Sequence, residues 1–138
     1  MPSPSPTTEN GRLIASMYEA FGRGDVEYVL AQIAPDVEWI ESDAEGLPAR
    51  GRSSSPQEVL ENVFAKVPQY FEHFELRPDL WVETGEDVVV TGHVLARTRS
   101  GRDLDAPYAH VFSFREGRVA RNDNFHDTAL WLQALAEG

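Results

Sequence analysis

The sequence predicts an α+β fold, because helical and strand-like patterns occupy separate parts of the chain. Apolar residues recur at helical spacing over residues 13–33, and a helix start follows near residue 55. From about residue 71 onward the pattern changes to long alternating stretches separated by short turn sequences. A short helical pattern follows residue 127, and Asp127 directly precedes it, so we expect Asp127 to cap the last helix. We therefore expect helices packed on a mixed, largely antiparallel sheet.

Length and composition indicate one domain. A chain of 138 residues with 41% hydrophobic residues can bury one sizeable core. The opening "MPSPSPTTEN" is rich in proline and serine, which predicts a disordered leader over residues 1–8 and a single domain over 9–138. It lacks the basic start and apolar stretch of a signal peptide, so we expect a cytoplasmic protein. No stretch approaches the roughly 20 apolar residues of a membrane helix.

The charge balance argues against several partners. Twelve basic and 23 acidic residues give a net charge of −11, which repels phosphate backbones and anionic lipid, so we expect neither nucleic acid nor membrane partners. The absence of cysteine excludes disulfides and thiolate metal sites. Four scattered histidines show no metal-ligand spacing, and we expect no metal.

Two helices are expected near the start. Residues 13–21 carry apolar side chains at helical spacing, "GRGD" at 22–25 interrupts the pattern, and it resumes over 26–33. Asp25 directly precedes the second apolar run, so we interpret it as a helix N-cap rather than as part of an adhesion motif.

A strand and a third helix follow. "DVEWIES" alternates, so Val37, Trp39 and Glu41 share one face of a strand. Residues 42–56 form a long irregular linker. Its end, "SPQE", has a capping serine, a proline at the first helical position and a glutamate three residues after the cap, and thus predicts a third helix. Long strands are then expected over 71–83, 87–99, 104–115 and 118–125.

The last hairpin has two candidate registers. A two-residue turn would force Glu116 to positive φ, so we expect a three-residue loop over 115–117. In that register His110 lies opposite Asn122 and Tyr108 lies opposite Asn124. Three more residues share their face: Phe112, Ala120 and His126. The alternative two-residue turn pairs His110 with Asp123 and moves the amides to the other face.

Four stretches carry a family resemblance: "MYEAFGRGDVEYVLAQIAPDVEWIE", "GHVLARTRSGR", "YAHVFSFREGRVA" and "FHDTALWLQAL". Over residues 12–136 the chain resembles the SnoaL-like branch of the nuclear transport factor 2-like superfamily, which includes ketosteroid isomerases and polyketide cyclases. The resemblance implies a cone-shaped, cystatin-like roll, in which N-terminal helices pack on a strongly curved sheet and a short helix follows. It also implies an apolar pocket for a hydrophobic small molecule, a homodimer, and no metal or organic cofactor.

The resemblance also implies roles for individual residues. Glu41 falls where ketosteroid isomerases place their catalytic base, and His110 falls near their hydrogen-bond-donating aspartic acid. Their oxyanion tyrosine falls on Met17, with Tyr18 one residue away. Asn124 falls where polyketide cyclases place a catalytic aspartate, although a neutral amide cannot act as a base.

These inferences give a candidate site. Glu41, His110 and Asn124 are the expected catalytic residues. The expected substrate-binding residues are Trp39, Tyr18, Tyr108, Phe112, Asn122, His126, His93 and Arg97. Each key residue also has a purely structural interpretation: Glu41 as an exposed rim carboxylate, His110 as a core histidine satisfied by Asn122, and Arg97 as a surface cation.

The predicted function is cofactor-free proton transfer on a hydrophobic carbonyl compound, by isomerisation, cyclisation or a related lyase or hydrolase step. The alternative is a non-catalytic binding or accessory domain that uses the same cavity. The convex face of the sheet would expose Ala109, Val111 and Phe125, which predicts a homodimer formed through the sheets.

Overall fold

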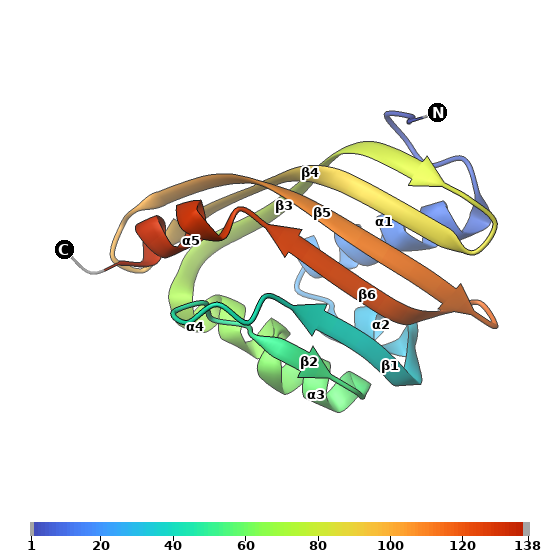
Figure 1. Cartoon of the computed structure of the whole chain (residues 1–138), viewed down its shortest axis with the longest axis horizontal. Coiled ribbons are helices and arrows are strands. Elements are labelled where there is room, and N and C mark those ends of the chain that lie inside the picture. Colours follow the sequence, from blue (N-terminus) through green and yellow to red (C-terminus); the bar gives the residue numbers. More distant parts are fainter. Residues whose placement is uncertain (1, 137–138) are drawn as a thin grey trace.

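The computed structural model describes residues 2–136; Met1 in the expected leader and residues 137–138 in the expected domain lie outside the described residues. One six-stranded sheet, in the order β2-β1-β6-β5-β4-β3, carries the helices (Figure 1). The strands are β1 (Ile33–Glu41), β2 (Gly51–Ser53), β3 (Phe71–Glu83), β4 (Asp87–Thr98), β5 (Asp103–Arg115) and β6 (Arg118–His126). The helices are α1 (Glu9–Gly22), α2 (Val26–Ala31), α3 (Pro56–Asn62), η1 (Phe64–Lys66), α4 (Val67–Tyr70) and α5 (Thr128–Leu135).

The sheet is mixed and strongly bent, as expected. β1 runs parallel to β6, and all other neighbouring pairs are antiparallel. Figure 1 shows the long strands β3, β4 and β5 curving over the helices α1 to α4, with α5 beside one end of the sheet. The α+β class and the helix–sheet–helix order of the chain are confirmed.

The bend in β3 and β4 depends on close backbone packing at Gly92 of β4. A Cβ atom at this position would lie 2.2 Å from the carbonyl oxygen of Arg77 and 2.8 Å from Cα of Pro78 on β3. The register of β3 against β4 shifts between Pro78 and Leu80. Such bulges bend a strand and increase its twist, so glycine permits the two strands to cross closely where the sheet curves.

Three helix starts match their predicted caps. The side chains of Asp25, Ser55 and Asp127 each accept a hydrogen bond from the backbone N–H three residues later. The second helix is shorter than its apolar pattern, because Ile33 pairs with Val119 and begins β1. Sheet pairing therefore overrides the helical spacing at that residue.

The leader makes specific contacts where disorder was expected. The backbone of Ser3 exchanges two hydrogen bonds with that of Trp81, at 2.9 and 2.8 Å. Thr7 and Thr8 donate backbone and hydroxyl hydrogen bonds to the carboxylate of Glu83. Burial alone would raise the pKa of Glu83, but these bonds together outweigh it and lower the pKa. The hydroxyl of Thr8 also caps α1. The contacts join residues 3–8 to the end of β3.

The preferred register of the last hairpin is wrong. Arg115 pairs with Arg118, so the turn contains two residues, and both Glu116 (φ 52°) and Gly117 (φ 77°) have positive φ. Positive φ at both central residues is the signature of a type I′ turn. The twist of this turn matches that of the flanking strands, and this match outweighs the unfavourable conformation of Glu116.

A β-bulge in β6 then changes which side chains of this strand point inward. Ala120 has no cross-strand partner, because Phe114 pairs with Val119 and Ser113 with Arg121. Beyond it, His110 pairs with Asn124, Phe112 with Asn122 and Tyr108 with His126. The extra residue returns both asparagines to the inner face, which was predicted correctly, although through different pairs.

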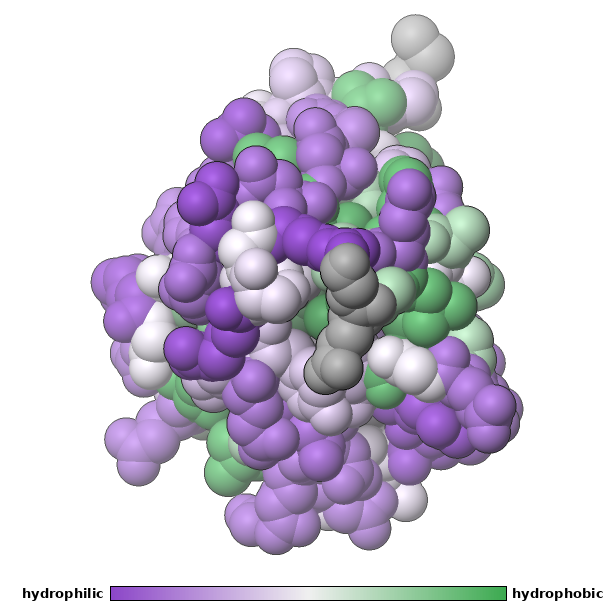
Figure 2. Space-filling model, turned by 90° about the vertical axis from the view of Figure 1, so that its left-hand side faces the viewer, coloured by the Kyte–Doolittle hydropathy of each residue, from purple (hydrophilic) through white to green (hydrophobic). Residues whose placement is uncertain are grey.

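The outer face of the sheet is partly apolar. Phe125 is 58% exposed, and the neighbouring β5 residues Ala109 and Val111 are half-buried. At the end of the molecule that carries α5, hydrophilic side chains dominate, with apolar ones between them (Figure 2). Between residues 2 and 136, no helix combines the length and apolar character needed to cross a membrane.

Candidate functional site

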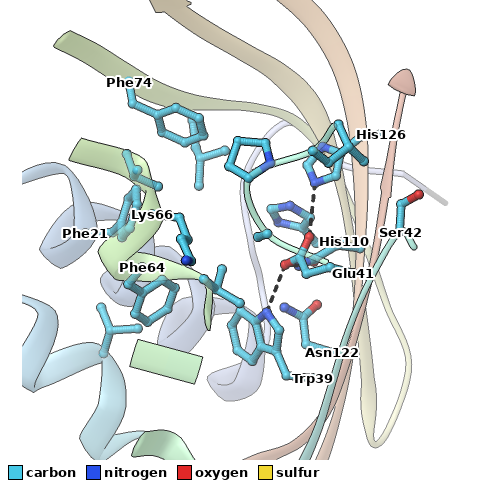
Figure 3. Close-up of a pocket in the computed structure, with 18 of the residues that line it drawn as sticks. Phe21, Trp39, Glu41, Ser42, Phe64, Lys66, Phe74, His110, Asn122 and His126 are labelled. Carbon is cyan, nitrogen blue, oxygen red and sulfur yellow. Dashed lines mark hydrogen bonds and ion pairs between the residues drawn. The ribbon is translucent and has the colours of Figure 1, made fainter. Parts of the chain in front are cut away.

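The inner face of the sheet and the helical layer enclose a cavity of about 110 Å³ (Figure 3). Its wall is almost entirely apolar and comes from α1, from the linker between β1 and β2, from the segment between α3 and β3, from β3 and from α5. Representative wall residues are Met17, Phe21, Leu47, Val63, Phe64, Val67, Phe71, Phe74, Leu76 and Trp131. Polar side chains gather at one end, on β1, β5 and β6.

A buried carboxylate is the centre of this polar end. Glu41, at the end of β1, is only 9% exposed. Its Oε2 accepts a hydrogen bond from Trp39 Nε1 at 3.0 Å and another from Asn124 Nδ2. Its Oε1 lies 3.7 Å from His126 Nε2. Strand alternation brings Trp39 and Glu41 to one face, and the parallel pairing of β1 with β6 brings Asn124 and His126 to them.

A histidine–tyrosine pair lies beside the carboxylate. Nδ1 of His110 is 2.6 Å from the hydroxyl of Tyr18 on α1. Burial holds the pKa of His110 well below its usual value, and a positive charge on nearby His126 would lower it further. Burial, with Tyr108 nearby, also raises the pKa of Tyr18 well above its usual value. Both groups are therefore neutral at physiological pH, and either can donate a hydrogen bond.

Several polar atoms at this end have no protein partner within residues 2–136. Three belong to residues that line the cavity: Asn122 Oδ1, Asn124 Oδ1 and His126 Nδ1. A fourth, the hydroxyl of Tyr108, belongs to a ring that packs on His110. Asn122 is 1% exposed, and burial raises the pKa of Tyr108 to about 12. A buried polar group without a partner is destabilising, so a protein tolerates it more readily where a ligand or water completes the bonding.

Most of the predicted site residues meet at the cavity. Eight of them line it: Tyr18, Trp39, Glu41, His110, Phe112, Asn122, Asn124 and His126. Glu41 is not an exposed rim carboxylate, and the partner of His110 is Tyr18 rather than Asn122. Tyr108 packs on the ring of His110, with ring centroids 4.3 Å apart, but does not line the cavity.

The placement of His93 and Arg97 in the cavity is wrong, and Arg97 is a surface cation, as its alternative interpretation predicted. Both side chains project from the outer face of β4, where His93 contacts Asp105 at 2.7 Å and Arg97 contacts Asp103 at 2.9 Å. The inward positions of β4 belong to residues such as Val94, which is fully buried. The alternation of β4 thus excludes the two residues from the cavity.

Sequence reasoning missed the wall opposite the sheet. Leu47 comes from the linker, Phe64 and Lys66 come from η1, and Trp131 comes from α5. One sequence feature could have drawn attention to this wall, because Lys66 is the sole lysine of the chain. Residues 2–136 contain no group of three or more histidine, aspartate or glutamate side chains arranged to hold a metal ion.

Comparison with known proteins identifies relatives of this architecture. The family of SnoaL-like domains matches residues 14–122. No curated protein is significantly similar in sequence. A nuclear transport factor 2-like protein of unknown function from Burkholderia pseudomallei is 30% identical, with a TM-score of 0.88 over 95% of this chain and 100% of its own.

Two further solved structures share this architecture. TerC, co-crystallised with polyporic acid, is 26% identical, with a TM-score of 0.84 over 93% of this chain and 98% of its own. A candidate polyketide cyclase from Pseudomonas putida is 18% identical, with a TM-score of 0.80 over 94% of this chain and 100% of its own. At this identity the second likeness establishes the shared fold alone.

Proposed function

Because this chain belongs to the family of SnoaL-like domains, we propose that it catalyses a cofactor-free proton transfer on a hydrophobic carbonyl compound. The observation that carries the proposal is the buried carboxylate of Glu41 beside the neutral imidazole of His110, at the polar end of a largely apolar cavity. An isomerisation, an aldol-type cyclisation, or a related lyase or hydrolase step would use such a pair.

Glu41 is the base in this proposal. It removes a proton from the carbon next to the substrate carbonyl, and negative charge develops on the carbonyl oxygen as an enolate. In an isomerisation, the same carboxyl group returns the proton at another carbon. The contacts from Trp39, Asn124 and His126 fix the carboxylate in one orientation, so little motion is needed before proton transfer.

His110 stabilises the developing charge. When the Tyr18 hydroxyl donates to Nδ1, the proton of the neutral imidazole resides on Nε2, which can donate to the enolate oxygen. A neutral donor already in place within a dry site stabilises such charge without reorganisation of solvent. Asn122 adds a second polar group on the same face.

A second candidate function, ligand binding without catalysis, is favoured by one observation. Oε2 of Glu41 already accepts two hydrogen bonds from protein donors, so both of its lone pairs are occupied before a substrate arrives. The co-crystal of TerC with polyporic acid supports a small-molecule ligand under either function.

The test begins with native mass spectrometry of the purified protein to identify a retained ligand. Turnover of that ligand is then compared between the wild type and Glu41→Gln, which keeps the shape of the side chain. We expect the rate to fall by roughly two to four powers of ten. Glu38→Gln is the matched control, because Glu38 lies on the outer face of the same strand and contacts Arg121. Full activity in Glu41→Gln would exclude Glu41 as the base, whereas no turnover of the ligand by the wild type would leave binding without catalysis as the better function.

A further inference from the structure

The only lysine in the 138 residues lies in the cavity. Lys66 ends η1, just before α4, and it is one of the lining residues. Figure 3 shows its side chain entering the cavity from the helical side, near Phe64 and across from Glu41. The other eleven basic residues of the chain are arginines, and none of them lines the cavity.

Lys66 also differs from the arginines in its contacts. Arg77, Arg97 and Arg121 each contact a carboxylate on the outside of the protein, at 2.9–3.1 Å. Within residues 2–136, the ammonium group of Lys66 has neither an ion-pair partner nor a side-chain hydrogen bond. Its three N–H donors are therefore free to bind a ligand.

The charged groups of the cavity lie on opposite sides. Lys66 is on the helical wall, whereas Glu41 lies on the sheet, at the polar end that also carries His110 and His126. An anion near Glu41 would be repelled, and an anion near Lys66 would be attracted. Aromatic side chains of the wall, such as Phe64, can hold an apolar ligand body between these two sides.

We propose that the cavity selects an apolar ligand with an anionic oxygen group, such as a carboxylate, and that this group binds Lys66. The orientation follows from the charges: the anionic group meets the ammonium, and the carbonyl to be activated meets His110 and Glu41. This orientation rests on the proposed function, whereas the anion selectivity of Lys66 does not. A cavity of about 110 Å³ encloses a body of about one ring, since an engineered cavity of about 150 Å³ binds benzene.

Two other roles for Lys66 give different results in the test. Its aliphatic stem could simply cover apolar surface, in which case its charge would not affect binding. Its amine could attack a ketone and expel water to form an imine, as catalytic lysines do.

The test uses hydrocinnamate and hydrocinnamamide, an anion and its neutral counterpart on the same phenyl-bearing chain. Isothermal titration calorimetry measures both with the wild type, Lys66→Met and Lys66→Arg. We expect the wild type to bind the acid at least about tenfold more tightly than the amide, as a charge-assisted hydrogen bond would give. Lys66→Met should reduce this ratio to about one, and Lys66→Arg should retain most of it. No binding of the acid, equal binding of both compounds, or an unchanged ratio in Lys66→Met would overturn the proposal.

Two measurements separate this proposal from the proposed function. Glu41→Gln should keep the preference for the acid, because it removes a negative charge and leaves Lys66 in place; loss of the preference would count against Lys66 as its source. Borohydride treatment with phenylpyruvate should leave the mass of the protein unchanged at Lys66. A reduced adduct at that residue would identify an imine-forming amine and refute the anion-binding role.

Discussion

The burial of His110 makes the stability of the protein depend on pH. The residue is 7% exposed and lies among Tyr18, Tyr108, Phe112 and His126. Burial, followed by the influence of His126, lowers its pKa in the folded state well below 6.5. In the unfolded chain the imidazole binds a proton at its ordinary pKa of about 6.5. Between these two values the unfolded state holds more protons, so a fall in pH favours unfolding.

The size of the effect follows from linkage. The stabilising contribution is fully present above the unfolded pKa and is lost as pH falls toward the folded pKa, by up to about 1.4 kcal/mol per pH unit. From about pH 7.5 to about pH 5, the free energy of unfolding should therefore decrease by up to about 2 kcal/mol on account of His110 alone. His110→Gln should lack this decrease, while it keeps a polar partner for the Tyr18 hydroxyl.

Urea unfolding, followed by tryptophan fluorescence at both pH values, measures this difference. Subtracting the pH dependence of the variant from that of the wild type removes the contributions of all groups that titrate in the same way in both proteins. His73→Gln is the matched control, because His73 is exposed and its removal deletes no buried imidazole. Equal pH dependence in the wild type and His110→Gln would show that His110 takes up a proton as easily in the folded state as in the unfolded state, and it would refute the argument from burial.

Two further predictions concern the sheet. Glu116→Asn should raise the free energy of unfolding by about 0.5–1 kcal/mol, because Asn-Gly suits the positive φ at both positions of this turn. Thermal melts measure this gain in stability, and an unchanged or lower Tm would contradict the strain at Glu116. For assembly, we propose a homodimer formed through the outer face of the sheet, where Phe125 is exposed. Light scattering should then give a mass of twice 15.4 kDa for the wild type, and Phe125→Glu should shift the measured mass toward that of the monomer. A wild-type monomer at micromolar concentration would remove that proposal.

Local patterns predicted the fold well where one physical signal dominated. The caps at Asp25, Ser55 and Asp127 depend on a side chain three residues from the N–H that it binds, so they are visible in sequence. The inner placement of Trp39 and Glu41 depends only on strand alternation. These features require no knowledge of distant parts of the chain.

The errors arose where two effects competed. The φ argument against a two-residue turn was sound for Glu116 taken alone, but the twist of a long hairpin outweighed it. The bulge at Ala120 has no sequence signature of its own, because no glycine marks it. His93 and Arg97 were misplaced because alternation shows which residues share a face of the strand, but not which of the two faces points inward. That choice depends on the register, which the neighbouring turn sets.

The polar inner face of β6 is best understood through the cavity. Asn122 and Asn124 are 1% and 8% exposed, and their burial is tolerated in part because Asn124 donates to the carboxylate of Glu41. Apolar residues in their place would pack the strand but leave Glu41 with fewer donors, in a site where an unsolvated charge is costly. The same hydrogen bond thus helps to hold β6 against β1 and to orient the carboxylate. The fold and the candidate chemistry depend on the same residues, so a variant of Asn124 must be assayed for stability and for ligand turnover together.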